Sequence, residues 1–212
     1  MGREALRCGH YSSGEEMKSK LLPQLVTLVV LVGGCAGIRQ TASTEFPGRQ
    51  HSLLSPNGTS VVRNTDADTQ EEQIALGDNH ALVLEDLRSG QRKMIYPYPR
   101  HVTVKWSPNG QRLAITDFDG SDHASCSIFS VADERLINVE AAIMNEFGSY
   151  HAELAASHLY FAASSWIDDK LLKVSATGYG LSNGHLFTRN YVYNLSTGEV
   201  SAEGEKKRGL HQ

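Results

Sequence analysis

A short motif recurs along this chain, and it limits the folds that the sequence can adopt. Ser-Pro-Asn-Gly at residues 55–58 returns 52 residues later at 107–110. The second copy is longer and reads Trp-Ser-Pro-Asn-Gly-Gln-Arg-Leu-Ala-Ile-Thr-Asp from Trp106 to Asp117, and a weaker third copy runs from Trp166 to Val174. Repetition at this spacing is typical of folds that place similar supersecondary units in series.

The units themselves read as β-structure. Short runs of alternating apolar and polar residues are separated by turn signals, and this pattern predicts antiparallel strands. A second set of turn signals alternates with the first, with Gly90 and Gly198 expected to adopt a positive φ. One short helix is predicted, from Val139 to Phe147. The predicted strands cover residues 101–106, 112–116, 126–131, 159–162, 171–174 and 187–193, and the second set of turns lies at 86–91, 130–135 and 194–199.

The motif resembles the WD-like blades of the periplasmic TolB family, in which the usual text is W-S-P-D-G-[KR]-x-[LI]-A-[FY]. The resemblance covers residues 51–96, 101–135 and 157–200, and it implies that the Trp packs between blades while Pro-Asn-Gly turns the chain. Asn57 and Asn109 replace the family's Asp, and Leu54 stands where the first blade would carry Trp.

The number of blades is limited by length. The 178 residues from Cys35 onward hold only about three and a half units of this size, whereas closed propellers typically need four to eight blades. We therefore predict an all-β domain, an antiparallel meander of about three blade-like sheets that forms a small or partial β-propeller. A β-sandwich is the alternative. Open strand edges invite pairing with another chain.

The N-terminal region has the features of a targeting signal. Lys18 and Lys20 precede an apolar run at 21–32, which is followed by Gly33-Gly34-Cys35. This order is that of a secretory signal, and the run is too short for a membrane span. The end of the run resembles the lipobox of bacterial lipoproteins. That resemblance implies a lipidated Cys35 at the mature N-terminus, with Ala36 after it favouring the outer membrane. An ordinary cleaved signal with an incidental cysteine is the alternative.

These segments give a predicted organisation. Residues 1–16 are polar and read as a start-site extension, residues 17–34 as the signal peptide, and residues 35–50 as a flexible tether. The β-domain covers 51–204, and a charged tail covers 205–212. The formal net charge of −4 argues against nucleic-acid binding, and three cysteines cannot build a disulfide framework.

Three local patterns are candidates for chemistry. Ser182 lies in a G-x-S-x-G pattern at 180–184, but a strand pattern follows it and only 30 residues remain for the rest of a hydrolase triad. The Asp117–His123 segment carries three carboxylates and an imidazole. Ile128 stands where a calcium loop needs Glu, which favours a polar hairpin. Cys126 is predicted to be a buried structural thiol. We predict no catalytic, cofactor-binding or metal-binding residue.

The predicted function follows from the N-terminal targeting signal and from the lack of a recognisable set of catalytic residues. We expect an envelope lipoprotein, attached to the membrane by lipid on Cys35, whose β-domain binds a partner, such as an envelope protein, without catalysis. The periplasmic side of the outer membrane is the favoured location. One alternative is an envelope hydrolase that uses Ser182 or the Asp117–His123 cluster, and another is a purely structural envelope lipoprotein.

Overall fold

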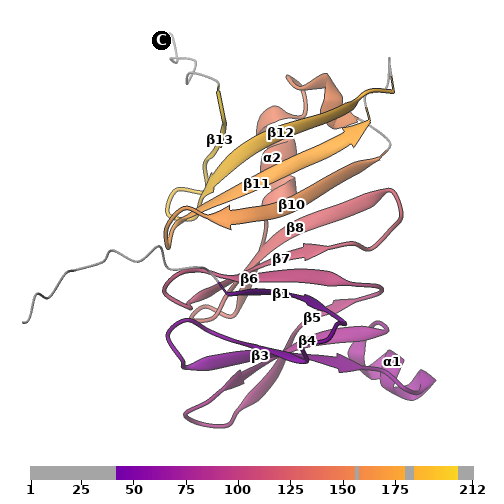
Figure 1. The fold of residues 1–212 in the computed structure, drawn as a ribbon, viewed down its shortest axis with the longest axis vertical. Coiled ribbons are helices and arrows are strands. Elements are labelled where there is room, and N and C mark those ends of the chain that lie inside the picture. Colours follow the sequence, from indigo (N-terminus) through magenta and orange to yellow (C-terminus); the bar gives the residue numbers. More distant parts are fainter. Residues whose placement is uncertain (1–41, 156–157, 180–183, 205–212) are drawn as a thin grey trace, which may run out of the picture. The chain divides into compact units, whose positions relative to one another are not determined.

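The computed structural model describes residues 42–155, 158–179 and 184–204, and within them the chain forms three four-stranded antiparallel blades (Figure 1). Blade 1 is a sheet of its own, and its strands follow one another in chain order. They are β2 (Ser52–Leu54), β3 (Ser60–Asp66), β4 (His80–Asp86) and β5 (Arg92–Tyr98). A seven-residue helix, α1 (Gln70–Leu76), lies in the connection between β3 and β4.

Blades 2 and 3 repeat this meander. Blade 2 consists of β6 (Val102–Trp106), β7 (Arg112–Asp117), β8 (His123–Ser130) and β9 (Arg135–Asn138). Blade 3 consists of β10 (Leu159–Trp166), β11 (Leu171–Tyr179), β12 (Leu186–Asn194) and β13 (Val200–Ala202). Between them lie α2 (Val139–Phe147) and a 3-10 helix, η1 (Ala152–Ala155). A two-residue parallel pairing of β10 with β8 joins both blades into one nine-stranded sheet.

The two ends of the blades are built differently. At one end, which we call the turn end, tight turns connect β2–β3, β4–β5, β6–β7, β8–β9, β10–β11 and β12–β13. At the opposite end, which we call the loop end, β3–β4, β5–β6 and β7–β8 are connected. In Figure 1 the turn end lies on the left, and the loop end lies on the right with α1.

The repeated motif holds the turn end together. The side-chain amide of Asn57 donates to the carbonyl oxygen of Asn109 over 2.8 Å, and the backbone N–H of Asn109 donates to Oδ1 of Asp169 over 2.7 Å. The turns of all three blades are therefore linked in series. Gly90 and Gly198 have φ of 70° and 74°, as predicted for the second set of turns.

Both tryptophans lie between blades. The indole N–H of Trp106 donates to the carbonyl oxygen of Leu53 in blade 1, and that of Trp166 donates to the carbonyl oxygen of Lys105 in blade 2. Each Trp thus reaches back to the preceding blade, as the resemblance implied. The middle blade is apolar on both faces: Leu113 and Ile115 face blade 1, whereas Ala114 belongs to the core shared with blade 3.

The outer face of blade 1 carries charges where blade 2 carries core residues. By repeat spacing and strand register, Arg63 and Glu85 take the places of Ile115 and Phe129. Arg63 Nε lies 2.8 Å from Glu85 Oε2, so an ion pair replaces an apolar contact. A charged face of this kind caps a stack of repeats instead of binding another repeat.

The outer face of blade 3 shows the same change. By register, Lys173 and Asn190 take the places of Ala114 and Cys126 of blade 2. Three blades therefore make a stack with a polar face at either end, which is the meander expected from the sequence and not the alternative sandwich.

Two predictions of local structure are corrected. Residues 42–46 were assigned to the tether, but β1 (Ser43–Phe46) pairs with β6, and Phe46 is completely buried in the core between blades 1 and 2. The exposed helix α1 was not predicted, although it begins at Thr69 with a capping box to Glu72 and ends at Gly77. The helix predicted at 139–147 is confirmed as α2.

Candidate functional site

The loop end is where the three blades stop resembling one another. The turn end is built from the recurring Pro, Asn and Gly residues that the fold needs for its turns. The loop end holds a helical insertion in blade 1, a polar hairpin in blade 2 and residues that do not recur between blades. Because the repeat already accounts for the scaffold, side chains that break it are candidates for function.

Asp117, the last residue of β7, is the most conspicuous of these. It is 6% exposed, and its Oδ2 accepts a hydrogen bond of 2.9 Å from the Tyr96 hydroxyl of blade 1. Among the described residues no donor reaches its Oδ1. Burial, with the nearby charges of Asp119 and Asp78, raises the pKa of Asp117 to about 6. The corresponding residues are Thr65 in blade 1 and Ala176 in blade 3, so the fold itself does not require a carboxyl here.

His123 bridges two elements beside this carboxyl. Its Nδ1 lies 2.9 Å from Oδ1 of Asp119 in the same hairpin, and its Nε2 lies 3.2 Å from Oε1 of Glu140 in the first turn of α2. Burial lowers the pKa of His123, but the hydrogen bonds with Asp119 and Glu140 outweigh it and raise the pKa overall. Both ring nitrogens are engaged with carboxylates, so in this arrangement neither is placed to accept a proton from a nucleophile.

Blade 1 contributes a second imidazole–carboxylate pair. His80 Nδ1 lies 2.7 Å from Oδ1 of Asp66, and the His80 ring stacks on the Tyr98 ring at 5.1 Å. The Tyr98 hydroxyl donates to the side-chain oxygen of Asn64. Burial raises the pKa of Asp66, but the hydrogen bonds from Asn64 and His80 prevail and lower it overall.

The loop-end segments of blades 1 and 2 are strongly negative. Residues 65–80, 99–101 and 117–123 contain eight carboxylates and one arginine. The turns of the opposite end, 55–59, 87–91, 107–111, 131–134, 167–170 and 195–199, contain five carboxylates and two basic residues. The loop end therefore concentrates negative potential, which steers positively charged groups toward it.

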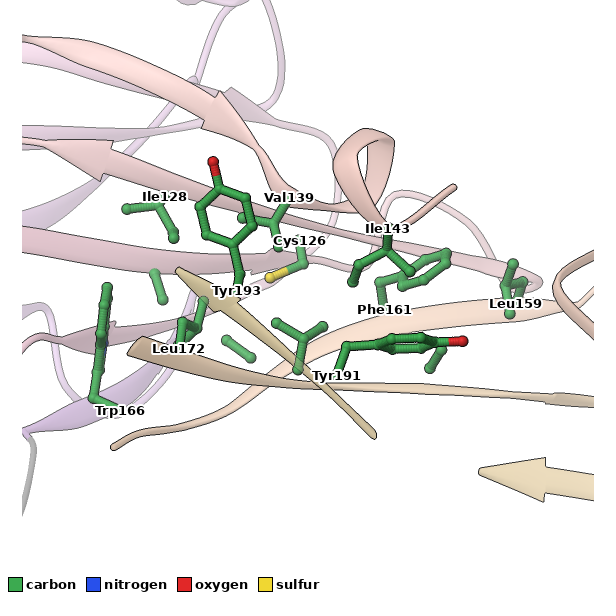
Figure 2. Close-up of a cluster of buried hydrophobic side chains, with 14 of the residues drawn as sticks. Cys126, Ile128, Val139, Ile143, Leu159, Phe161, Trp166, Leu172, Tyr191 and Tyr193 are labelled. Atoms are coloured by element: carbon green, nitrogen blue, oxygen red, sulfur yellow. The ribbon is translucent and has the colours of Figure 1, made fainter. Parts of the chain in front are cut away.

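The sequence-predicted residues separate into three cases. Cys35 and Ser182 lie outside the described residues. Asp117 and His123 lie at the same end of blade 2, where the structure adds Tyr96 and Glu140. Cys126 is completely buried, and Figure 2 shows its sulfur among the side chains of the core between blades 2 and 3. Burial raises the pKa of the Cys126 thiol to about 12, so the thiol stays protonated at neutral pH.

Tyr96 and Glu140 were missed for a reason visible in the sequence. Tyr96 precedes Pro97, a residue type that is uncommon inside strands, yet residues 96–98 complete strand β5. Glu140 was placed correctly in a helix, but no local pattern connects it with His123, 17 residues earlier.

Two classes of feature are absent from the described part of the chain. Within residues 42–155, 158–179 and 184–204, no three or more His, Cys, Asp or Glu side chains are grouped so that they could hold a metal ion. Over the same ranges, no helix is long and apolar enough to cross a membrane.

Comparisons with known proteins give distant structural neighbours. The sequence matches no family model and no curated protein. The β-propeller domain of the Trilobed protease from Pyrococcus furiosus, which has an open velcro topology, is similar with a TM-score of 0.48 and 16% identity, over 74% of this chain and 43% of that one. TolB from Acinetobacter baumannii has a TM-score of 0.39 and 13% identity, over 73% of this chain and 32% of its own.

A third neighbour is Porphyromonas gingivalis dipeptidyl peptidase 4, with a TM-score of 0.45 and 11% identity over 74% of this chain. The chain spans less than half the length of each of these structures, and the match covers 26% of the peptidase. The assignment of three blades rests on the strand order and register described above.

Proposed function

We propose that this protein is a membrane-anchored envelope lipoprotein whose β-domain binds a partner at its loop end without catalysing a reaction. The observation that carries the proposal is the difference between the two ends of the blades. In repeat proteins, insertions that depart from the repeat gather on one face, and that face is often the binding face. Here the turn end repeats, and the loop end carries the irregular connections and the titratable side chains that break the repeat.

The anchor is supported by the sequence alone. Lys18, Lys20, the apolar run at 21–32 and the Gly-Gly-Cys at 33–35 follow the order of a lipoprotein signal. The first described residue is Ala42, and β1 begins at Ser43. A chain acylated at Cys35 would therefore have only a short segment between its lipid and its first strand. Two or more acyl chains are needed for stable attachment to a membrane.

Site-specific photo-crosslinking in cells tests the binding surface. A photoreactive residue is placed at Asp122 in the loop end of the full chain, and at Ser196 in the turn end as the matched control. Both positions are exposed. We expect a discrete cross-linked protein band from position 122 and none from position 196. Equal cross-linking from both positions, or from position 196 only, would refute the assignment of the loop end.

Intact-mass measurement of the protein from the membrane fraction tests the anchor. The expected mass is that of a chain beginning at Cys35 with added acyl groups, and the Cys35→Ala variant should lose both the acyl mass and membrane retention. An unmodified chain, or one that starts at another residue, would contradict the lipoprotein assignment.

The absence of catalysis is tested separately. Ester and peptide substrates are offered to the purified chain and to its Ser182→Ala variant. Turnover by the parent chain that is lost in the variant would replace binding by hydrolysis as the function.

A further inference from the structure

We infer that the partner at the loop end is a protein segment rich in Lys or Arg side chains, and that the basic groups bind over Asp117 and the carboxylates around it. This inference rests on the proposed function, because it specifies the chemistry of the partner bound at that surface.

The first argument is the set of uncompensated charges. Of the eight carboxylates in these segments of blades 1 and 2, several have structural roles: Glu72 caps α1, Asp78 caps the following backbone N–H, and Asp66 pairs with His80. Others do not. Among the described residues, none forms an ion pair or hydrogen bond with the carboxylates of Asp68, Glu71 or Asp122, which are all exposed. These three carboxylates have no role in the fold that the described residues show.

The second argument is Asp117 itself, which is independent of the exposed charges. A buried carboxyl oxygen without a donor is unfavourable, since burial removes its water without replacing the hydrogen bond. The other two blades avoid this unfavourable burial, because Thr65 and Ala176, which carry no charge, stand at the corresponding positions. The sequence nevertheless keeps a carboxyl here, within reach of the charges of Asp78 and Asp119. A cation bound above it would offset this cost, which gives the residue a function.

The groups around Asp117 come from both blade 1 and blade 2. Tyr96 of β5 donates to its Oδ2. Asp78, in the segment before β4, and Asp119, in the β7–β8 hairpin, add negative charge, while His123 of β8 opposes them. Glu140 of α2 holds the far side of the His123 ring. Because the carboxylates outnumber the imidazole, the site as a whole attracts a cation.

Binding of a cation should therefore displace protons. Burial and the neighbouring carboxylates raise the pKa of Asp117 to about 6, and a positive group placed nearby must lower it again. Between about pH 5 and 7 the carboxyl should lose a fraction of a proton when the partner binds. If Asp117 had only a structural role, binding of the partner would release no proton from it.

The experiment uses the full chain and two synthetic peptides of equal length, one of alternating Lys and Gly and one of alternating Glu and Gly. Isothermal titration calorimetry at pH 6 in two buffers with different ionisation enthalpies measures both affinity and proton release. We expect measurable binding of the Lys peptide only, with proton release, and with an affinity that falls as salt rises.

The variants locate the binding surface. Asp117→Thr copies the residue of blade 1 and should abolish proton release and weaken Lys-peptide binding at least about fivefold. Asp122→Asn alters an exposed residue, so it should leave folding unchanged and weaken binding about twofold to threefold. Glu199→Gln, at the turn end, is the matched control and should have no effect. If Asp117→Thr does not fold, Asp122→Asn and Glu71→Gln carry the test.

Several results would overturn the inference. Equal binding of both peptides, no binding of the Lys peptide, or unchanged binding by the loop-end variants would do so. Binding of spermine or a divalent cation without binding of the Lys peptide would identify a small cation as the ligand instead. If cross-linking at position 122 succeeds while the Lys peptide fails, the inference falls and the proposed binding surface remains. If cross-linking fails as well, both are refuted.

Discussion

Replacing Asp117 by Asn should stabilise the folded protein at neutral pH, contrary to the usual effect of altering a buried residue. Burial is the first cause of the rise in its pKa, from 3.8 to about 6. Each unit of such a shift corresponds to about 1.4 kcal/mol. The ionised carboxylate therefore costs the folded state about 3 kcal/mol, and Asn keeps an oxygen that can accept the Tyr96 hydrogen bond.

The sign of the pH dependence follows from linkage. The folded state binds the Asp117 proton more tightly than the unfolded chain does, so stability rises as the pH falls. The cost is fully present above the folded pKa, at pH 7 to 8, and it disappears below the unfolded pKa near 4. The gain from Asp117→Asn should accordingly be about 2–3 kcal/mol at pH 8 and close to zero at pH 4.

Urea unfolding at several pH values between 4 and 8 provides the assay. The protein's two tryptophans, Trp106 and Trp166, both lie at contacts between blades, so their fluorescence reports blade separation. Midpoints and slopes are compared for the parent chain and the variant, and equal slopes are required before the free energies are subtracted. The titration of His123 contributes to both curves and largely cancels in the difference.

Two outcomes would refute this reasoning. A stability difference that stays constant from pH 4 to pH 8 would show that the Asp117 carboxyl does not titrate as a buried group. A variant less stable than the parent chain at pH 8 would show that the carboxylate makes favourable contacts in the folded state.

The remaining predictions concern the scaffold. Gly110→Ala should destabilise the protein more than Gly90→Ala in the same urea assay. Both glycines have a positive φ, but only a Cβ at 110 would meet the side chain of a neighbouring turn, at 2.7 Å. Gly90→Ala should lower the free energy of unfolding by about 1 kcal/mol. Trp166→Phe should cost about 1–3 kcal/mol through the lost indole hydrogen bond to blade 2 and reduced packing, and an unchanged midpoint would exclude that contact as a stabilising one. Combining Arg63→Ile with Glu85→Phe places the apolar pair of the middle blade on the outer face of blade 1, and light scattering should then show stronger concentration-dependent self-association than for the parent chain.

Much of the scaffold was predictable because its signals are local. The turn at 107–110 and the strand that follows it depend on residues within one hairpin, and the alternation of Val102, Val104 and Trp106 places three apolar side chains on one face. The limits of helix 139–147 were also predictable, because Asn138 caps it and its apolar residues share one side. The helix at 70–76 was missed because it buries no residue and so lacks an apolar face.

The candidate site was only half visible from the sequence. The stretch from Asp117 to His123 stands out by composition, but its partners do not. Tyr96 reaches Asp117 only because blade 1 packs against blade 2, and Glu140 reaches His123 only because α2 folds back along β8. The capping role of Arg63 and Glu85 also requires the register, which aligns them with core residues of the middle blade.

The amino-acid sequence by itself determined the repeat, the blade count, the turns and the strand phases, since these depend on side chains a few residues apart and on the alternation of a pleated strand. The tertiary structure alone decided which outer blade faces carry polar and charged side chains in place of core residues, and which end of the stack carries the irregular side chains. It also decided that Asp117 is buried with one oxygen that no donor among the described residues reaches. Those properties depend on which distant segments meet, and short-range patterns in a chain carry no information on that.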